Sequence, residues 1–294
     1  MKPTVVDKSR SFSETLKNFY SLTKPGIIFG NVITLIGGFL LASRAGINLY
    51  LLISTMLGMS LVIACGCVFN NVIDADIDQL MKRTQNRLIA RGIISVRTAL
   101  LFATALGLLG FLVLGLQTNL LTVVVSIVGL FFYVIVYSLF FKRRSVFGTT
   151  VGGVAGAVPP VVGYCAVTNH FDAGAIILFS ILFFWQMPHS YAIAIFRLKD
   201  YAAANIPVLP VKKGIPYTKV SMMVYIVAFT LAAVMPYFFG YANFFYFLVA
   251  LSVGVFWFFK GLKQYRTKDD ALWAKKLFLF SVLGITVLSF AMIF

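Results

Sequence analysis

The sequence predicts an all-α, polytopic membrane protein with nine transmembrane helices, a cytoplasmic N-terminus and a periplasmic C-terminus. Three observations lead to this prediction. The 294 residues are 60% hydrophobic and only 12% charged, whereas a soluble domain has about 25% charged residues. The mean hydropathy is +0.94. Nine apolar stretches are long enough to cross a bilayer, and the basic residues gather in alternate connections between them.

The apolar stretches define the expected helices, because about 20 apolar residues span the hydrocarbon core. Pro25 and Gly26 open the first helix, where proline is tolerated in the first turn. Gly152, Gly153 and Pro159 interrupt the fifth. Such a break is compatible with close helix packing and equally with backbone that lines a cavity. The expected spans are residues 26–43, 49–70, 98–116, 120–141, 147–167, 174–195, 218–238, 242–259 and 274–293.

The charge distribution supports this count of spans. Nine spans place 24 of the 25 Lys and Arg residues in five connections on one side, beginning with the N-terminal segment 1–24, and leave only Arg44 on the other. By the positive-inside rule these five connections face the cytoplasm. The net charge of +16 therefore reflects membrane topology and not nucleic-acid binding. We expect one membrane domain over residues 1–294.

The three cysteines lie in apolar stretches. Cys65 and Cys67 are separated by one residue, which is not the spacing of a zinc or redox motif, and Cys165 stands alone. We expect buried thiols that pack as small hydrophobic side chains.

A polar series follows the second span. Asn70, Asp74 and Asp78 are spaced i, i+4, i+8, which on a helix keeps three side chains on one face. Asp76 points roughly the opposite way, where solvent or a basic partner is expected. Hard oxygen ligands suit Mg²⁺, which usually also binds substrate phosphate. The series lacks the Gly and the terminal Glu of an EF-hand, which excludes that kind of site.

Asn70, Asp74 and Asp78 are therefore the expected metal ligands. Basic residues that could bind diphosphate oxygens follow them, with Arg able to form bidentate pairs: Lys82, Arg83 and Arg87. The alternative is a capped helix end followed by a solvated loop of mixed charge.

A second candidate loop follows the sixth span, and Asp200 is its only acid. If the two loops converge, Asp200 would complete the metal site, and Arg197 and Lys199 would contact phosphate. The alternative is an ordinary charge cluster at the membrane interface.

His189 lies within or near the sixth span, where histidine is rare and usually faces the bundle interior. It could transfer a proton, contact heme, or be a hydrogen-bonded interior residue. His170, beside Asp172, is expected at the surface on the other side, so a bis-histidine heme site is not supported.

Taken together, these segments resemble the UbiA superfamily of intramembrane prenyltransferases, whose first aspartate-rich motif matches the Asn70–Asp78 series. The finer resemblance is to the bacterial members that farnesylate heme. The matching segments are Thr23–Gly26, Asn70–Asp78, Arg83–Arg87, Pro188–Ala192, Lys199–Tyr201 and Ile206–Pro210.

The resemblance implies nine helices around a central cavity that opens to the cytoplasm and laterally to the lipid bilayer. It implies a bacterial inner-membrane enzyme that uses Mg²⁺ to transfer farnesyl from farnesyl diphosphate to a vinyl group of heme B, with addition of water, giving heme O. The product would pass to a terminal oxidase or to a heme A synthase. The catalytic residues would be Asp74, Asp78, Asp200 and His189, with His189 and Tyr191 binding heme.

One departure from the superfamily concerns the second loop. Members that act on aromatic rings usually carry a second D-x-x-x-D, but Phe196 and Ala204 stand four residues either side of Asp200. Lys199 or Arg197 would then supply positive charge in place of a second metal ion. Two alternative functions stay open: a prenyltransferase with another aromatic acceptor, such as a quinone precursor, and a membrane transporter.

Overall fold

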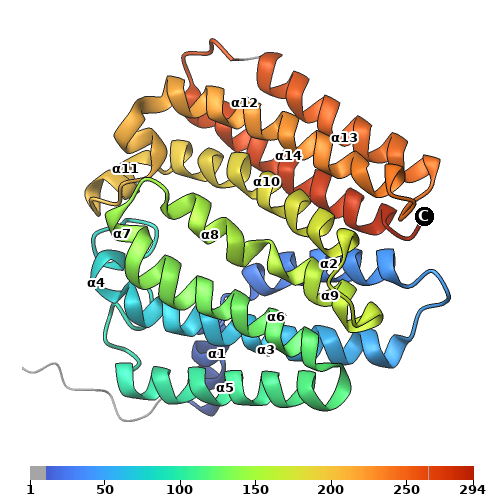
Figure 1. Ribbon diagram of the computed structural model, residues 1–294. Coiled ribbons are helices and arrows are strands. Elements are labelled where there is room, and N and C mark those ends of the chain that lie inside the picture. Colours follow the sequence, from blue (N-terminus) through green and yellow to red (C-terminus); the bar gives the residue numbers. More distant parts are fainter. Residues whose placement is uncertain (1–10, 264) are drawn as a thin grey trace, which may run out of the picture.

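The computed structural model describes residues 11–263 and 265–294 (Figure 1). Within these residues every regular element is a helix, and nine segments are long and apolar enough to cross a membrane. The predicted all-α fold and the order of the spans are confirmed. The basic residues Lys2, Lys8 and Arg10, predicted to be cytoplasmic, lie outside the described residues.

Nine membrane segments are formed by single helices or by consecutive helices. They are α2 Pro25–Ala42, α3 Leu49–Ile73, α5 Val96–Gln117, α6 Leu120–Phe131 with η1 Phe132–Phe141 and α7 Lys142–Arg144, α8 Gly148–Gly156 with α9 Val158–Thr168, α10 Ala173–Phe196, α12 Leu209–Phe238, α13 Phe244–Lys263 and α14 Asp270–Ala291. The shorter helices outside them are α1 Phe12–Leu22, α4 Ala75–Asp78 and α11 Leu198–Ala203.

Two predicted helix starts are wrong by several residues. The seventh span begins at Leu209 and not at residue 218, but Gly214 interrupts it with φ 81° and ψ 165°. The chain before Gly214 is thus a separate turn, Leu209 to Lys213, in which two lysines follow three apolar residues. The ninth span begins at Asp270 and not at residue 274, because the side chain of Asp269 accepts a hydrogen bond from the Leu272 amide at 2.9 Å and caps the helix.

The sequence did not predict α1. This helix packs Phe19 and Leu22 against the ends of α3 and α5, while Phe12 and Leu16 are 78% and 55% exposed. With 11 residues it is far too short to cross a membrane. Its sequence therefore contains no apolar run long enough to predict a span.

Small residues allow the long helices to approach closely. A Cβ on Gly110 would lie 2.9 Å from the Gly58 carbonyl oxygen, where α5 meets α3. The fifth span does break, at Ala157 between α8 and α9. A Cβ on Gly156 would lie 1.9 Å from Gln186 Oε1, so close packing is the role of this glycine. The three cysteines are free and buried, as predicted.

The bundle has two distinct ends. The site end comprises residues 74–95, 142–147 and 197–208, and includes α4, α7 and α11 on the left of Figure 1. The far end comprises residues 43–48, 118–119, 169–172 and 239–243 with the C-terminus, on the right. The two candidate loops thus lie at the same end.

Candidate active site

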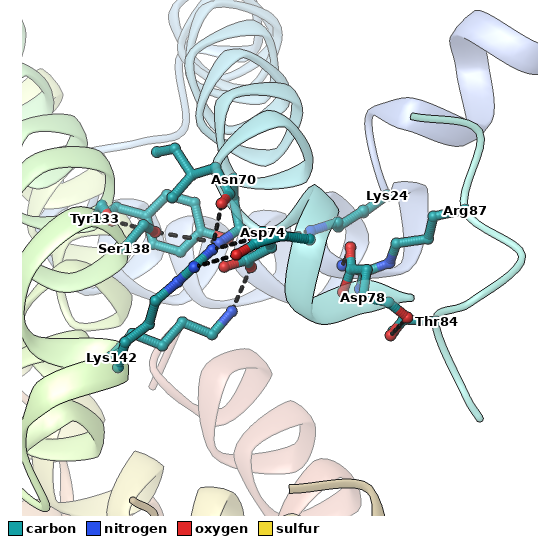
Figure 2. Close-up of polar contacts among 12 residues, drawn as sticks. Lys24, Asn70, Asp74, Asp78, Thr84, Arg87, Tyr133, Ser138 and Lys142 are labelled. Atoms are coloured by element: carbon teal, nitrogen blue, oxygen red, sulfur yellow. Dashed lines mark hydrogen bonds and ion pairs between the residues drawn. The ribbon is translucent and has the colours of Figure 1, made fainter. Parts of the chain in front are cut away.

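The acidic series sits where α3 gives way to the single turn of α4. The spacing predicts that Asn70, Asp74 and Asp78 lie on one continuous helix. Instead, Asp74 ends α3 with φ −90° and ψ 1°, and α4 begins after it. The i, i+4 connections nevertheless persist, because the Asp74 amide donates to the Asn70 carbonyl at 2.9 Å and the Asp78 amide to the Asp74 carbonyl at 2.8 Å. The side chains of Asn70, Asp74 and Asp78 consequently gather in one place (Figure 2).

This place is dry. Asn70, Asp74 and Asp78 are 4%, 0% and 1% exposed, so these three side chains are not part of a solvated loop, although Lys82 and Arg83 after them are exposed. Lys142 Nζ pairs with Asp74 Oδ2, and Arg87 Nη1 lies 2.7 Å from Asp78 Oδ2. The Oδ1 atom of each carboxylate is buried without a hydrogen-bond partner. A buried carboxylate oxygen left unpaired costs free energy, so a cation that bound these two atoms would relieve that cost.

Lys24 reaches the site from the start of α2. Its Nζ donates to Asn70 Oδ1 at 2.7 Å. Its φ of 54° places it in the left-handed region directly before Pro25, a conformation that costs free energy and is characteristic of functional sites. Burial, and next the neighbouring Arg87, lower the pKa of Lys24 to about 7. An anion bound here would offset both effects and favour the charged ammonium.

The π-helix η1 forms the wall opposite α3. Asn70 Nδ2 donates to Ser138 Oγ at 3.1 Å, and Ser138 Oγ donates to the Tyr133 carbonyl at 2.8 Å, five residues earlier. The wider turn of a π-helix brings residues four to five apart into one row, and such segments are frequent at functional sites. Tyr133, Ser138 and Lys142 all face the acidic series in Figure 2.

Asp76 lies apart from the site, as predicted. Arg143 donates to both its carboxylate oxygens, at 2.6 and 2.7 Å. Hydrogen bonding to Arg143 holds the pKa of Asp76 below its usual value. This exposed pair ties α4 to α7 without using Asp74 or Asp78.

The second loop meets the first. Asp200, on α11, accepts a hydrogen bond from the Lys82 amide at 3.1 Å. Below it Ile77 and Met81 pack against Ala204 and Ile206. The predicted convergence of the two loops is therefore confirmed. The side chains of the outer basic residues are exposed around this contact: Lys82, Arg83, Arg197 and Lys199.

Convergence does not by itself assemble a complete metal cage. In the described part of the chain, no three His, Cys, Asp or Glu side chains form a group that could hold a metal ion together. The ligand set Asn70, Asp74, Asp78 and Asp200 stays a prediction. The unpartnered oxygens of Asp74 and Asp78 fit it, because Mg²⁺ is bound through one or two carboxylates together with substrate phosphate.

His189 and Tyr191 lie on α10 but contact different helices. His189 Nδ1 is 2.7 Å from Ser281 Oγ on α14, whereas the Tyr191 ring is 6.1 Å from that of Tyr225 on α12. Two residues apart on a helix, their side chains point to different sides. The structure does not bring the two predicted heme-binding residues together.

Sequence reasoning missed two residues of the site. Lys24 lies in the matching segment Thr23–Gly26, and Lys142 lies in a basic run after the fourth span, but their sequence positions indicate only a cytoplasmic charge. Nothing in their local sequence says that they approach Asn70 and Asp74, 46 and 68 residues away.

Comparison with known proteins places this geometry in context. The model of the UbiA prenyltransferase family matches residues 31–283. A curated relative from Serratia proteamaculans (strain 568), named protoheme IX farnesyltransferase, is 54% identical over 277 residues, which cover 94% of each chain.

Two solved structures share the fold at low identity. A digeranylgeranylglyceryl phosphate synthase has a TM-score of 0.76 at 18% identity, covering 95% of this chain and 98% of that one. A UbiA homologue from Archaeoglobus fulgidus, bound to GPP and Mg²⁺, has a TM-score of 0.71 at 17% identity, covering 94% of this chain and 99% of that one.

Proposed function

The chain belongs to the UbiA prenyltransferase family, and from this premise we propose that it transfers farnesyl from farnesyl diphosphate to a vinyl group of heme B. Water adds in the same reaction, giving heme O and diphosphate. The observation that carries the proposal is the pair of buried carboxylates, Asp74 and Asp78, each with one unpartnered oxygen and each beside a cation. Relatives named protoheme IX farnesyltransferase support the choice of acceptor.

Mg²⁺ is the metal we propose, held by Asn70, Asp74 and Asp78 from the first loop and by Asp200 from the second. When bound, it would neutralise the charge that develops on the leaving diphosphate. The donor set is entirely oxygen, which suits this hard cation.

The cations of the site bind the diphosphate. Lys24, Arg87 and Lys142 lie at the acidic series, and the last two exchange a carboxylate partner for a phosphate oxygen when substrate arrives. Preorganised positive charge in a dry site stabilises the departing anion strongly. The exposed outer residues Arg83 and Lys199 raise the local concentration of the anionic substrate.

Breaking the carbon–oxygen bond leaves an allylic cation on the farnesyl chain, and the diphosphate departs with the bonding electrons. The vinyl group of heme attacks this cation, and water captures the new cation beside the porphyrin and loses a proton. The buried surroundings of Asp74 exclude water from the first cation. Tyr133, on the wall facing Asn70, presents an aromatic ring on this side of the site.

The first half of α2 gives the apolar substrates room beside this charge. A Cβ on Gly26 or Gly30 would meet no atom within 4 Å, and Phe29 is 70% exposed. This fits the central cavity and lateral access to lipid that the family resemblance implies. We propose that His189 and Tyr191 contact heme from α10, each from its own side.

The proposed location is a bacterial inner membrane, with the site end in the cytoplasm. It rests on the basic connections, which gather at that end. Cysteines introduced as Arg44→Cys and Lys199→Cys test it, because the native cysteines are buried. A membrane-impermeant thiol reagent added to intact cells should label the first and spare the second. The reverse pattern would contradict the orientation.

We further propose that a terminal oxidase or a heme A synthase receives the product.

The decisive experiment supplies purified protein with farnesyl diphosphate, heme B and Mg²⁺ and measures heme O by mass. Chelation of the metal should stop product formation, and added Mg²⁺ should restore it. Product from a quinone precursor, with none from heme, would indicate the other acceptor class. Movement of substrate across vesicles without bond formation, persisting in Asp74→Ala, would indicate a transporter.

A further inference from the structure

Ser281 on α14 connects three groups of the α10–α14 contact. It is fully buried. Its hydroxyl donates to the Phe278 carbonyl at 2.6 Å, and its own carbonyl accepts the Trp185 indole N–H at 2.9 Å. Its Oγ lies 2.7 Å from His189 Nδ1. One small side chain and its carbonyl thus bind both the imidazole and the indole that stacks on it.

These bonds determine which imidazole nitrogen carries the proton. A serine hydroxyl has a single hydrogen and two lone pairs, and the hydrogen of Ser281 is committed to the Phe278 carbonyl. The 2.7 Å contact with His189 can then form only if Nδ1 is the donor. A neutral imidazole that is protonated on Nδ1 carries its free lone pair on Nε2.

The orientation of the ring is fixed as well. The His189 ring stacks on Trp185 with centroids 4.5 Å apart and lies 4.8 Å from the Phe278 ring. Ser281 accepts the Trp185 indole N–H through its carbonyl, so the ring that stacks on the imidazole is held by the residue that also binds Nδ1. The residue as a whole is only partly buried.

We infer that Ser281 is a positioning residue that holds His189 as the Nδ1–H tautomer, so that Nε2 presents the lone pair required to bind the iron of heme. The iron ligand rests on the proposed function, whereas the tautomer rests only on the hydrogen bonds. Histidines that bind metals almost always donate their other ring N–H to an acceptor, and loss of that acceptor typically weakens metal affinity 10- to 100-fold. Here the acceptor is a serine oxygen.

The tautomer can be measured directly because the chain has only two histidines. His170 is exposed at the far end and serves as the internal reference. In ¹⁵N-histidine-labelled protein in lipid, nitrogen NMR separates protonated from unprotonated ring nitrogens, and His170→Gln assigns the signals. We expect wild-type His189 to be protonated on Nδ1 alone. Ser281→Ala should give a mixture of tautomers, and Ser281→Thr, which keeps the hydroxyl, should restore the single form.

Two results of this NMR experiment would overturn the inference: wild-type His189 protonated on Nε2, or a tautomer unchanged in Ser281→Ala. A residue that only clamps α10 to α14 would lower the unfolding temperature when mutated but would leave the tautomer alone. The Thr variant keeps the test usable if the Ala variant folds poorly.

Heme binding tests the iron ligand separately. Titration of heme B should give a nitrogen-ligated absorption spectrum that is lost in His189→Gln. The apparent Kd should rise about tenfold in Ser281→Ala and less than about twofold in Ser281→Thr. An unchanged spectrum in His189→Gln would refute iron ligation. Absence of any heme binding by the wild type would contradict the proposed function itself, while the NMR result still decides the tautomer.

Discussion

The two halves of α2 have different surroundings. Residues 34–41 are mostly buried at the far end, where a Cβ on Gly38 would lie 1.9 Å from the Pro160 carbonyl oxygen and a Cβ on Gly37 2.9 Å from Ser289. None of residues 25–33 is buried, and a Cβ on Gly26 or Gly30 would meet no atom within 4 Å. The helix is thus held firmly at one end and left open where Lys24 enters the charged site.

This difference separates two tasks that one helix performs. The far half supplies stability through backbone contact, which needs glycine because lipid gives helices little other reason to associate. The near half supplies a cation and space, and it does so at the cost of packing. Mutations at the site end should therefore affect catalysis, and mutations at the far end should affect folding.

The largest effect is expected at Asp74. Asp74→Asn removes the charge of a fully buried carboxylate. We expect kcat to fall by about 100- to 1,000-fold, which is the typical loss when an enzyme loses one group that stabilises charge in the transition state. Asp76→Asn is the control, because that side chain is exposed and pairs with Arg143. Heme O formation measures both. A full rate for Asp74→Asn without a requirement for Mg²⁺ would reject the metal role.

Lys142 should show the next largest effect, on substrate binding. Lys142→Met removes the cation beside Asp74, and the KM for farnesyl diphosphate should rise by about 10- to 100-fold, the equivalent of one charge-assisted hydrogen bond. Arg144→Met removes a basic side chain two residues away that lies over the Phe140 ring. Its KM should stay within about twofold of the wild-type value. Equal effects of the two changes on KM would mean that Lys142 does not bind the diphosphate and only contributes to the charge of the cytoplasmic connection.

The far half of α2 can be tested through its own glycines. Gly38→Ala forces a Cβ onto the Pro160 backbone and should lower the free energy of unfolding by about 1–3 kcal/mol. Gly30→Ala, on the same helix, meets no atom and should be neutral or stabilising by up to about 1 kcal/mol. Thermal unfolding in detergent gives the apparent Tm of each. A loss of stability in Gly30→Ala but not in Gly38→Ala would contradict the claim that the far half of α2 is the tightly packed one.

The smallest effect is expected at the exposed rim of the site end. Lys199→Ala removes a solvated cation next to Asp200, so the KM for farnesyl diphosphate should rise by no more than about fivefold. High salt should shrink the difference from wild type, because exposed charges are screened. A loss as large as that of Lys142→Met would place Lys199 on the diphosphate itself.

The membrane architecture was predictable because its cause is local. Each span needs an apolar run of about 20 residues. The basic residues in alternate connections support the number of spans. The predictions that failed concern segments without a long apolar run: α1 has only 11 residues, and the turn before Gly214 contains two lysines. The break at Asp74 depends on local geometry that i, i+4 spacing does not reveal.

The sequence by itself determined the nine membrane segments of residues 11–263 and 265–294 and their order, because the length of each apolar run is a local property; it also predicted a site at Asn70, Asp74 and Asp78. Only the tertiary structure decided that Lys24, Arg87 and Lys142 surround those acids, that the Asp200 loop touches the first loop, and that Ser281 holds His189. These contacts join residues that are mostly distant in the chain, and helix packing, which fixes their distances, leaves no local mark in the sequence.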